Sequence, residues 1–227
     1  MGRPRYFLEI EVAHQKHGLL LSQRKYTLDL LEKTDMLGAN LLALQWKQMW
    51  IYGVSSLDDL GQYRRLIEKF IYLTVTRPDI TFAVGVLCRF MHQPREVHWT
   101  TAMRILPYIK SSPEKDLLYK KYGHVRIFGY SDSGYTGDKG NRKSTTGYCT
   151  FVGGNLVTWR SKKQDVSRSS VVADYIAMAH TACEIMWLKN LLLELGLRQS
   201  VLMPMFCDNE SAILSHKILC FMRGLSI

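Results

Sequence analysis

A strand, a hairpin and a long helix in the second half of the chain constrain its fold most. The apolar residues 125–130 have the composition of a strand, and Asp132 stands at its end. Two further strand-like runs, 147–152 and 155–160, are separated by two glycines, which is typical of a hairpin. Apolar residues then recur at helical spacing over 166–195, in a stripe of Val172, Ile176, Ala179, Cys183, Trp187, Leu191 and Leu195. This order predicts a sheet with a long helix on its face.

A second carboxylate stands at the end of another short strand. Pro204 precedes a strand-like run over 205–207, and Asp208 follows it. Two strand-end carboxylates, Asp132 and Asp208, could together hold a metal ion near a phosphate group. Aspartate is also an ordinary turn residue at the end of a strand, so the spacing by itself leaves both interpretations open.

The first half of the chain carries a hairpin and then several helices. A strand-like run over 5–12 and a leucine run over 19–21 flank a turn, which predicts an N-terminal β-hairpin. Helical periodicity then predicts further helices, among them 80–91 and 97–109. Pro107 lies inside the second of these. It should remove a backbone hydrogen bond and kink the helix, at a cost of about 3 kcal/mol.

The composition favours a polyanionic partner. Lys and Arg outnumber Asp and Glu by 30 to 20, giving a formal charge of +10 in 227 residues. Such a surplus suits nucleic acid, although a basic protein without such a partner has the same balance. The five cysteines form no CxxC pair, which argues against a zinc site. No apolar run reaches the ~20 residues of a membrane span, and there is no signal-peptide core. We therefore expect no membrane partner and a cytoplasmic or nuclear location.

Two long motifs resemble copia-type retrotransposon polyproteins. The run YSDSGYTGDKGNRKSTTGYCTFVGGNLVTWRSKK, residues 130–163, is similar to the ribonuclease H domain of that family, whose signature runs close to YSDADWAGD…RKSTSGYC…GG..ISWKSKKQ. The later Cys-Asp-Asn at 207–209 matches a CDN motif of the family. The run RYFLEIEV…GLLLSQRKYTLDLLEKTDML, residues 5–37, resembles the last part of the reverse transcriptase. No Y-x-D-D occurs, so polymerase activity is not expected.

The resemblance implies an α/β fold, of the mixed α+β kind, in two domains. Residues 1–124 would be the C-terminal reverse transcriptase and connection region, mainly helical after its N-terminal β-hairpin. Residues 125–227 would be a ribonuclease H-like mixed sheet with flanking helices, truncated before its final helix. Residues 41–60 and 218–227 depart from the family. The first departure is either a local frame disruption or an amphipathic helix inserted in a variable linker.

The same resemblance implies a site with four metal ligands and two Mg²⁺ ions. Asp132 matches the first ligand and Asp208 the third, whereas Val172 occupies the position of the expected glutamate. Asp174 is the acidic residue nearby, but two helical steps rotate a side chain by about 200°, so it should face away from the cleft. The fourth ligand has no counterpart. Two of the four expected ligands are therefore missing, and catalysis should be impaired.

Basic and aromatic residues are present around this proposed site, although two of the expected acidic ligands are missing. Tyr135, Tyr148 and Trp159 are interleaved with the basic residues, a mixture that suits phosphates and stacking. The alternative is a solvated basic rim. The resemblance implies an RNA–DNA hybrid as the partner, recognised by backbone and shape. The residues predicted to bind it are Arg142, Lys143, Arg160, Lys162, Lys163 and Arg168.

Three hypotheses about function follow. The first is a retrotransposon-derived ribonuclease H-like fragment, catalytically impaired and at most nucleic-acid binding, which could pair with the rest of a Pol polyprotein. The second is an active Mg²⁺-dependent ribonuclease H, in which Asp174 or a partner chain replaces the missing ligand. The third is a translated relic without a function, consistent with Pro107 and the apolar run at 41–60.

Overall fold

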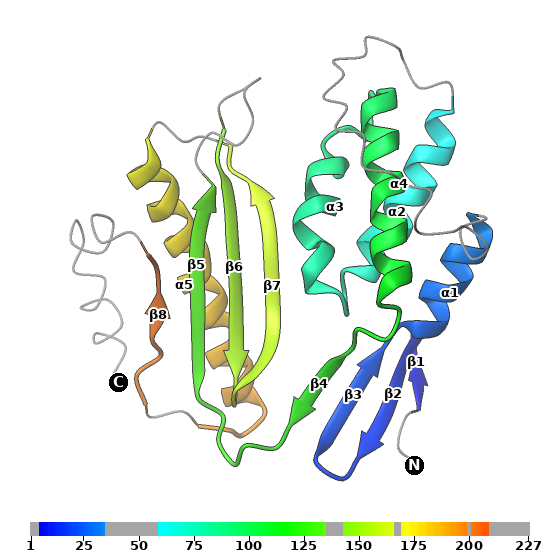
Figure 1. Ribbon diagram of the computed structural model, residues 1–227. Coiled ribbons are helices and arrows are strands. Elements are labelled where there is room, and N and C mark those ends of the chain that lie inside the picture. Colours follow the sequence, from blue (N-terminus) through cyan, green and yellow to red (C-terminus); the bar gives the residue numbers. More distant parts are fainter. Residues whose placement is uncertain (1–4, 35–58, 135–142, 166–168, 199–200, 209–227) are drawn as a thin grey trace. The chain divides into compact units, whose positions relative to one another are not determined.

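The computed structural model shows a chain of two compact units, Met1–Tyr119 and Lys120–Ile227 (Figure 1). Both units contain a four-stranded sheet and at least one helix, so the predicted mixed α/β class is confirmed. The second unit begins at Lys120, whereas the sequence predicts a division after residue 124. The structure describes residues 5–34, 59–134, 143–165, 169–198 and 201–208.

The first unit begins with the predicted hairpin. Strands β2 (Ile10–Gln15) and β3 (Gly18–Ser22) pair antiparallel, from Glu11 opposite Ser22 to Gln15 opposite Gly18. Strand β1 (Tyr6–Phe7) adds to β2, and β4 (Leu117–Lys120) completes the order β1-β2-β3-β4.

Helices α1 (Arg24–Lys33), α2 (Leu60–Leu73), α3 (Thr81–Cys88) and α4 (Glu96–Ser111) follow the hairpin, with a short 3₁₀ turn η2 (Pro78–Ile80) before α3. Pro107 does not end α4, which continues to Ser111. The apolar side of the last two turns is fully buried at Ile105, Leu106 and Ile109. Tertiary packing therefore holds this helix together despite the missing backbone donor. Residues 41–58 lie outside the described part of the chain.

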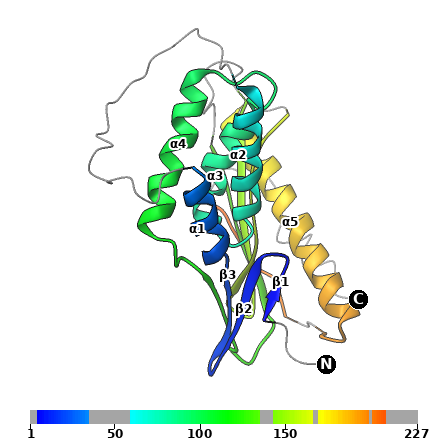
Figure 2. The ribbon, with the colours of Figure 1, turned by 90° about the vertical axis from the view of Figure 1, so that its right-hand side faces the viewer.

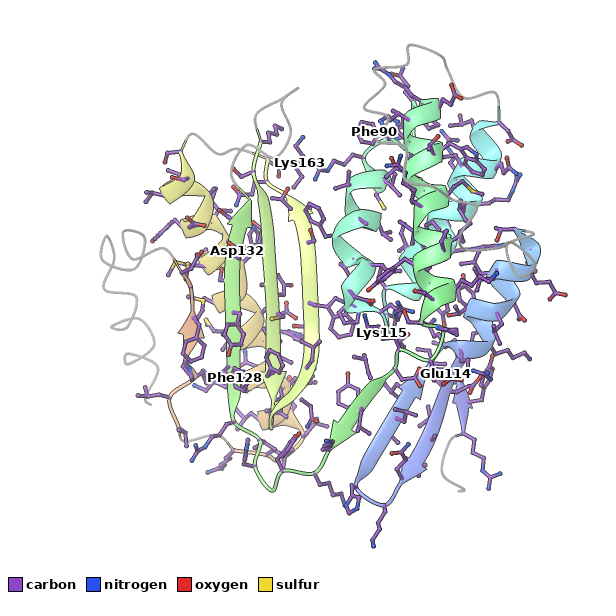
Figure 3. The ribbon with its side chains drawn as sticks, in the orientation of Figure 1. Phe90, Glu114, Lys115, Phe128, Asp132 and Lys163 are labelled. Carbon is purple, nitrogen blue, oxygen red and sulfur yellow. The ribbon has the colours of Figure 1, made fainter. Side chains whose placement is uncertain are left out.

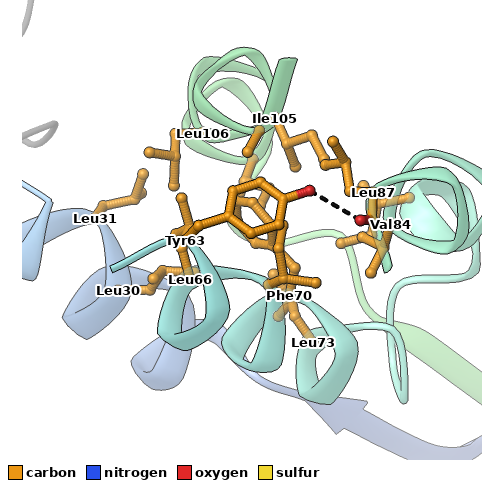
Figure 4. Packing of buried hydrophobic residues seen from close by; sticks show 14 residues of the cluster. Leu30, Leu31, Tyr63, Leu66, Phe70, Leu73, Val84, Leu87, Ile105 and Leu106 are labelled. Atoms are coloured by element: carbon orange, nitrogen blue, oxygen red, sulfur yellow. Dashed lines mark hydrogen bonds between the residues drawn. The ribbon is translucent and has the colours of Figure 1, made fainter. Parts of the chain in front are cut away.

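The core of the first unit forms between these helices, as Figure 4 shows. Tyr63, Ile67, Phe70 and Leu73 of α2 are fully buried at spacings of three and four residues, so they line one face of that helix. The Tyr63 hydroxyl donates to the carbonyl of Leu87 on α3 at 2.8 Å. Burial raises the pKa of Tyr63 well above its usual value, so the hydroxyl keeps its proton and stays a donor.

The second unit has the predicted order of strand, hairpin, helix and short strand. Its elements are β5 (Ile127–Gly134), β6 (Thr145–Val152), β7 (Asn155–Lys163), α5 (Ser170–Glu194) and β8 (Met205–Phe206). The sheet order is β7-β6-β5-β8. β5, β6 and β7 pair antiparallel, and β8 lies parallel to β5, so the sheet is mixed.

The hairpin turn between β6 and β7 requires its glycines. Gly153 and Gly154 both have positive φ angles, of 57° and 77°, which L side chains rarely adopt. A Cβ on Gly153 would also lie 2.4 Å from the carbonyl oxygen of His124. The glycine pair thus fixes the turn and, with it, the register of the two strands that it joins.

Helix α5 lies along the sheet (Figures 1 and 2) and contacts β5 and β6. By length and composition alone, α5 could cross a membrane. Eight of its residues are nevertheless buried within the unit, among them Asp174 and Thr181. This is the pattern of a core helix, so its apolar composition is weak support for a membrane span. The buried face does not follow the stripe from Val172 to Leu195: Val172, Trp187, Leu191 and Leu195 are exposed.

Candidate metal and nucleic-acid site

The second sheet has two chemically different faces. Successive side chains of a strand point to opposite sides. On β5, Ile127 is buried, a Cβ on Gly129 would lie 3.1 Å from Ile185 of α5, and Ser133 contacts Asp174 of α5. We call the side that carries these residues the helix face. Phe128 and Asp132 belong to the opposite face of the same strand (Figure 3).

The opposite face carries a cluster of aromatic rings beside the predicted carboxylates. Tyr130 of β5 and Phe206 of β8 stack with ring centroids 5.2 Å apart, and each is 48% exposed. Phe128 and Phe151 stack in parallel at 4.8 Å. Tyr130 also meets Phe151 edge to face at 6.0 Å. The rings hold β5, β6 and β8 together on this side of the sheet.

Asp132 belongs to β5, and Asp208 follows the neighbouring parallel strand β8 by two residues. The register of β5 and β8 pairs Gly129 with Met205 and Tyr130 with Phe206. Continued by two residues, the same register sets Asp132 beside Asp208. Both aspartates are exposed, and both follow the stacked ring of their own strand by two residues, so they share the opposite face. Two carboxylates in this position could coordinate a divalent cation through oxygen atoms.

Asp174 lies on the other side of the sheet from this pair. Its carboxylate is 6% exposed and accepts a hydrogen bond from the Ser133 hydroxyl at 2.6 Å. Ser133 is adjacent to Asp132 in sequence but belongs to the helix face. Val172, two residues earlier on α5, is 40% exposed. The described residues contain no group of three or more His, Cys, Asp or Glu side chains that could hold a metal ion.

The predicted basic residues divide between the described and undescribed parts of the chain. Arg160 and Lys162 pair with Tyr148 and Thr146 across the β6–β7 ladder. Thr146 is buried against α5, so Arg160 and Lys162 belong to the helix face and not to the face of Asp132. Lys143 is half-buried just before β6, and Lys163 is the last residue of β7. Arg142, Arg168 and Tyr135 lie outside the described residues.

A cavity of about 230 Å³ lies on the helix face between α5 and the β6–β7 hairpin. Its lining includes Thr146 and Tyr148 of β6, Arg160 and Lys162 of β7, and Ile176 and His180 of α5. Sequence reasoning considered Tyr148 only as a stacking residue. It had no signal for His180, because a single histidine on an apolar helix does not indicate a site.

Tyr148, which lines this cavity, interacts with a carboxylate and with a guanidinium. The Tyr148 hydroxyl donates to Glu184 of α5 at 3.2 Å. Burial and the Glu184 carboxylate raise the pKa of Tyr148, and a hydrogen bond with Arg160 opposes them. The guanidinium of Arg160 is thereby tied to the sheet at one end of the cavity. The side chain of Glu184 is occupied in this contact, on the same side of the sheet as Asp174.

The sequence of this chain is similar to polyproteins encoded by transposons. It is 38% identical over 211 residues to the retrovirus-related Pol polyprotein from transposon RE2 of Arabidopsis thaliana, covering 91% of this chain and 14% of that protein. It is 33% identical over 226 residues to the Pol polyprotein from transposon TNT 1-94 of Nicotiana tabacum, 94% of this chain and 17% of that protein. An uncharacterized mitochondrial protein of Arabidopsis thaliana is 35% identical over 190 residues, 82% of this chain and 79% of that protein.

These similarities place the chain among the proteins of transposable elements. It belongs to the retrovirus-related Pol polyproteins of copia-type transposons, as the motifs at 130–163 and 207–209 indicate. The chain spans about one seventh of the length of the transposon RE2 polyprotein. No family model matches the chain, and no solved structure matches it.

Proposed function

We propose that the second unit is a ribonuclease H-like domain of a retrotransposon Pol polyprotein that binds nucleic acid and is catalytically impaired. The observation that carries this proposal is the parallel register of β5 and β8 in the sheet β7-β6-β5-β8, which pairs Tyr130 with Phe206 and, continued by two residues, would set Asp132 beside Asp208. The helix α5 connects the antiparallel strands to the parallel one. This order of elements agrees with the domain that the motif at 130–163 resembles.

The described residues do not fit two Mg²⁺ ions. Hydrolysis by two metals needs several carboxylates that converge on both ions. Asp132 and Asp208 supply two carboxylates, and Val172 stands where the resemblance expects a glutamate. The carboxylate of Asp174 is hydrogen-bonded to Ser133 on the helix face. These contacts support binding of nucleic acid better than cleavage. They also weigh against the hypothesis that Asp174 replaces the missing ligand.

The basic residues support an RNA–DNA hybrid or a related polyanion as the ligand. Arg160 and Lys162 are exposed on alternate positions of β7, where both can contact the phosphate backbone. The chain has a formal charge of +10, so its association with nucleic acid should weaken steeply as salt rises. The first unit would be the trailing part of the reverse transcriptase, which serves as a packed helical support.

The test is binding and cleavage of a labelled RNA–DNA hybrid by the full chain, in Mg²⁺ and in Mn²⁺. We expect binding that depends on salt and no cleavage. The Val172→Glu variant restores the expected acidic residue at an exposed position, so it should fold like the unmodified chain. Any cleavage gained by this variant and lost again on Asp208→Asn would locate the catalytic site at Asp208.

Two outcomes would contradict the proposal. Cleavage by the unmodified chain, abolished by Asp132→Asn, would mean that the catalytic site is complete and that other groups supply the missing ligands. Failure to bind the hybrid, together with a broad or absent thermal transition, would favour the interpretation of the chain as a relic that does not fold into a functional domain.

A further inference from the structure

The cavity between α5 and the β6–β7 hairpin is distinct from the face of Asp132 and Asp208. It lies on the helix face, and its volume of about 230 Å³ is below the ~300–1,000 Å³ typical of pockets for whole small molecules. Its size therefore suits a single chemical group of a larger ligand. The cavity lies between two elements: the helix lines it with Ile176 and His180, and the hairpin lines it with Arg160 and Lys162.

The charges around the cavity favour an anion. Three cations line it, Arg160, Lys162 and Lys163, against one carboxylate, Asp165. In the part of the chain that the structure describes, neither Arg160 nor Lys162 forms an ion pair with a carboxylate. Both are exposed, so a ligand can reach them without displacing a packed side chain.

Gln164 makes the base of the cavity rigid. It is 5% exposed, its backbone N–H donates to the carbonyl of Ser144 at 2.8 Å, and its side-chain Nε2 donates to Thr146 at 3.0 Å and to the carbonyl of Ala173 at 2.7 Å. Because a carbonyl can only accept, the contact with Ala173 fixes the orientation of the amide. The Oε1 atom then has no hydrogen-bond partner among the described residues. The Oε1 atom is itself buried, so Gln164 orders the base of the cavity and does not contact a ligand.

We propose that this cavity binds one phosphate group of a nucleic-acid strand, held by Arg160 and Lys162. A phosphate matches the size of the cavity, its positive charge and the planar donors of arginine. The inference rests on the proposed function, since nucleic acid supplies the phosphate. It adds a contact on the side of the sheet away from the two carboxylates.

The experiment uses the full chain, its Arg160→Ala/Lys162→Ala variant and a matched control, Lys121→Ala/Arg126→Ala. The control residues are exposed in the same unit and do not line the cavity, so both variants lose two positive charges. Affinity for an RNA–DNA hybrid is measured across a range of salt concentrations. We expect the cavity variant to reduce the slope of log affinity against log salt by about 1, as for the loss of one phosphate contact. The control should leave the slope nearly unchanged.

A second measurement tests whether the cavity also binds free phosphate. Inorganic phosphate is titrated into the labelled chain, and the amide resonances of Thr146 and Gln164 are followed by NMR. Saturable shifts in the unmodified chain and the control, absent from the cavity variant, support a phosphate site. Equal slope changes in both variants, or no phosphate-induced shift, would overturn the proposal. Saturable phosphate binding without any binding of the hybrid would overturn the nucleic-acid source and the proposed function, but not the phosphate chemistry of the cavity.

Discussion

The two units differ most in what they bury. The core of the first unit contains fourteen residues, and apart from the hydroxyl of Tyr63 their side chains are apolar (Figure 4). Among the described residues of the second unit, the apolar cluster contains five, Ile127, Ile185, Leu188, Leu192 and Met203, and Ala173, Ala177 and Met178 are buried as well. Buried polar side chains take up much of the remaining interior of that unit: Ser131, Ser144, Thr146, Thr150, Gln164, Asp174 and Thr181.

This difference indicates where each unit carries its chemistry. Burying a polar group costs free energy unless it is hydrogen-bonded. Most of the polar groups inside the second unit meet this condition, as in the contact of Thr150 with Thr158 at 2.5 Å and of Thr181 with the carbonyl of Ala177 at 2.8 Å. Thr146 and Gln164 line the cavity, and Ser131 belongs to the strand that carries Asp132. The interior of the first unit is therefore mainly apolar, whereas the interior of the second contains a larger share of hydrogen-bonded polar side chains.

The first unit also buries polar side chains, namely Ser22, Gln23, Thr27, Thr76 and Arg77, and the last of these belongs to a charged network. Arg77, 2% exposed, donates from Nε and Nη2 to both carboxylate oxygens of Asp79, at 3.0 and 2.9 Å. Tyr108 and Lys115 also donate to Asp79, at 2.8 and 3.2 Å. The network ties the turn before α3 to the end of α4, while the Nη1 atom of Arg77 donates to the carbonyl of Ser112.

The largest expected effect is the loss of this network. Asp79→Ala leaves the buried guanidinium of Arg77 without its counter-charge, which typically costs about 3–5 kcal/mol of stability. We expect the loss to be confined to the first unit. Hydrogen exchange of the amides in α2 and α4 should accelerate, and that of β5 and β6 should not. Equal acceleration in both units would show that the two share one cooperative unfolding transition.

The same network should make the first unit sensitive to acid. Burial disfavours the charged form of Asp79, but hydrogen bonds from Arg77, Tyr108 and Lys115 outweigh it and hold the pKa of Asp79 well below its usual range. A lowered folded pKa contributes stability that is present above the unfolded value of about 3.9 and is lost as pH falls through the folded value. Below about pH 4, the unmodified chain should therefore lose stability faster than Asp79→Asn.

Pro107→Ala should change the stability of the first unit in the opposite direction. The substitution restores a backbone donor inside α4 and removes the clash of the ring with the preceding turn, at a position that is half-buried. We expect a gain of up to about 3 kcal/mol, measured by urea denaturation. A loss of stability would mean that the pyrrolidine ring contributes packing which alanine cannot replace.

A smaller effect is expected for the hydrogen bond to Asp174 in the second unit. Ser133→Ala removes a donor from a buried carboxylate and should cost about 1–3 kcal/mol. Ser131→Ala is the matched control, because Ser131 belongs to the same strand and face and its buried hydroxyl has no partner among the described residues. The control should be close to neutral. A comparable loss in both variants would contradict a specific role for the contact of Ser133 with Asp174.

The smallest expected effect is that of Val172→Glu on stability. The side chain is 40% exposed in the first turn of α5, where a negative charge interacts favourably with the helix dipole. The change should stay within about 0.5 kcal/mol, as for other exposed positions. A thermal scan of both chains measures it. A large loss would show that Val172 packs in solution and would exclude this variant as a probe of catalysis.

The local pattern of the sequence determined the elements of this protein. The hairpin at the N-terminus, the strand before Asp132, the glycine turn at 153–154 and the helix that ends before Gly196 all follow from composition and spacing, which act over a few residues. The motifs also determined the family. The predicted kink at Pro107 did not interrupt α4, because packing of its apolar side outweighs the lost hydrogen bond.

Only the tertiary structure decided which side each functional residue occupies. Spacing along α5 cannot show that Asp174 is buried against β5 while the apolar stripe from Val172 to Leu195 is partly exposed, since both patterns fit a helix. Nor can it show that β8, which precedes Asp208, pairs in parallel with β5, or that Arg160 and Lys162 lie on the side of the sheet opposite Asp132. A shift of one residue in strand register would reverse these faces, and pairing between distant strands sets that register.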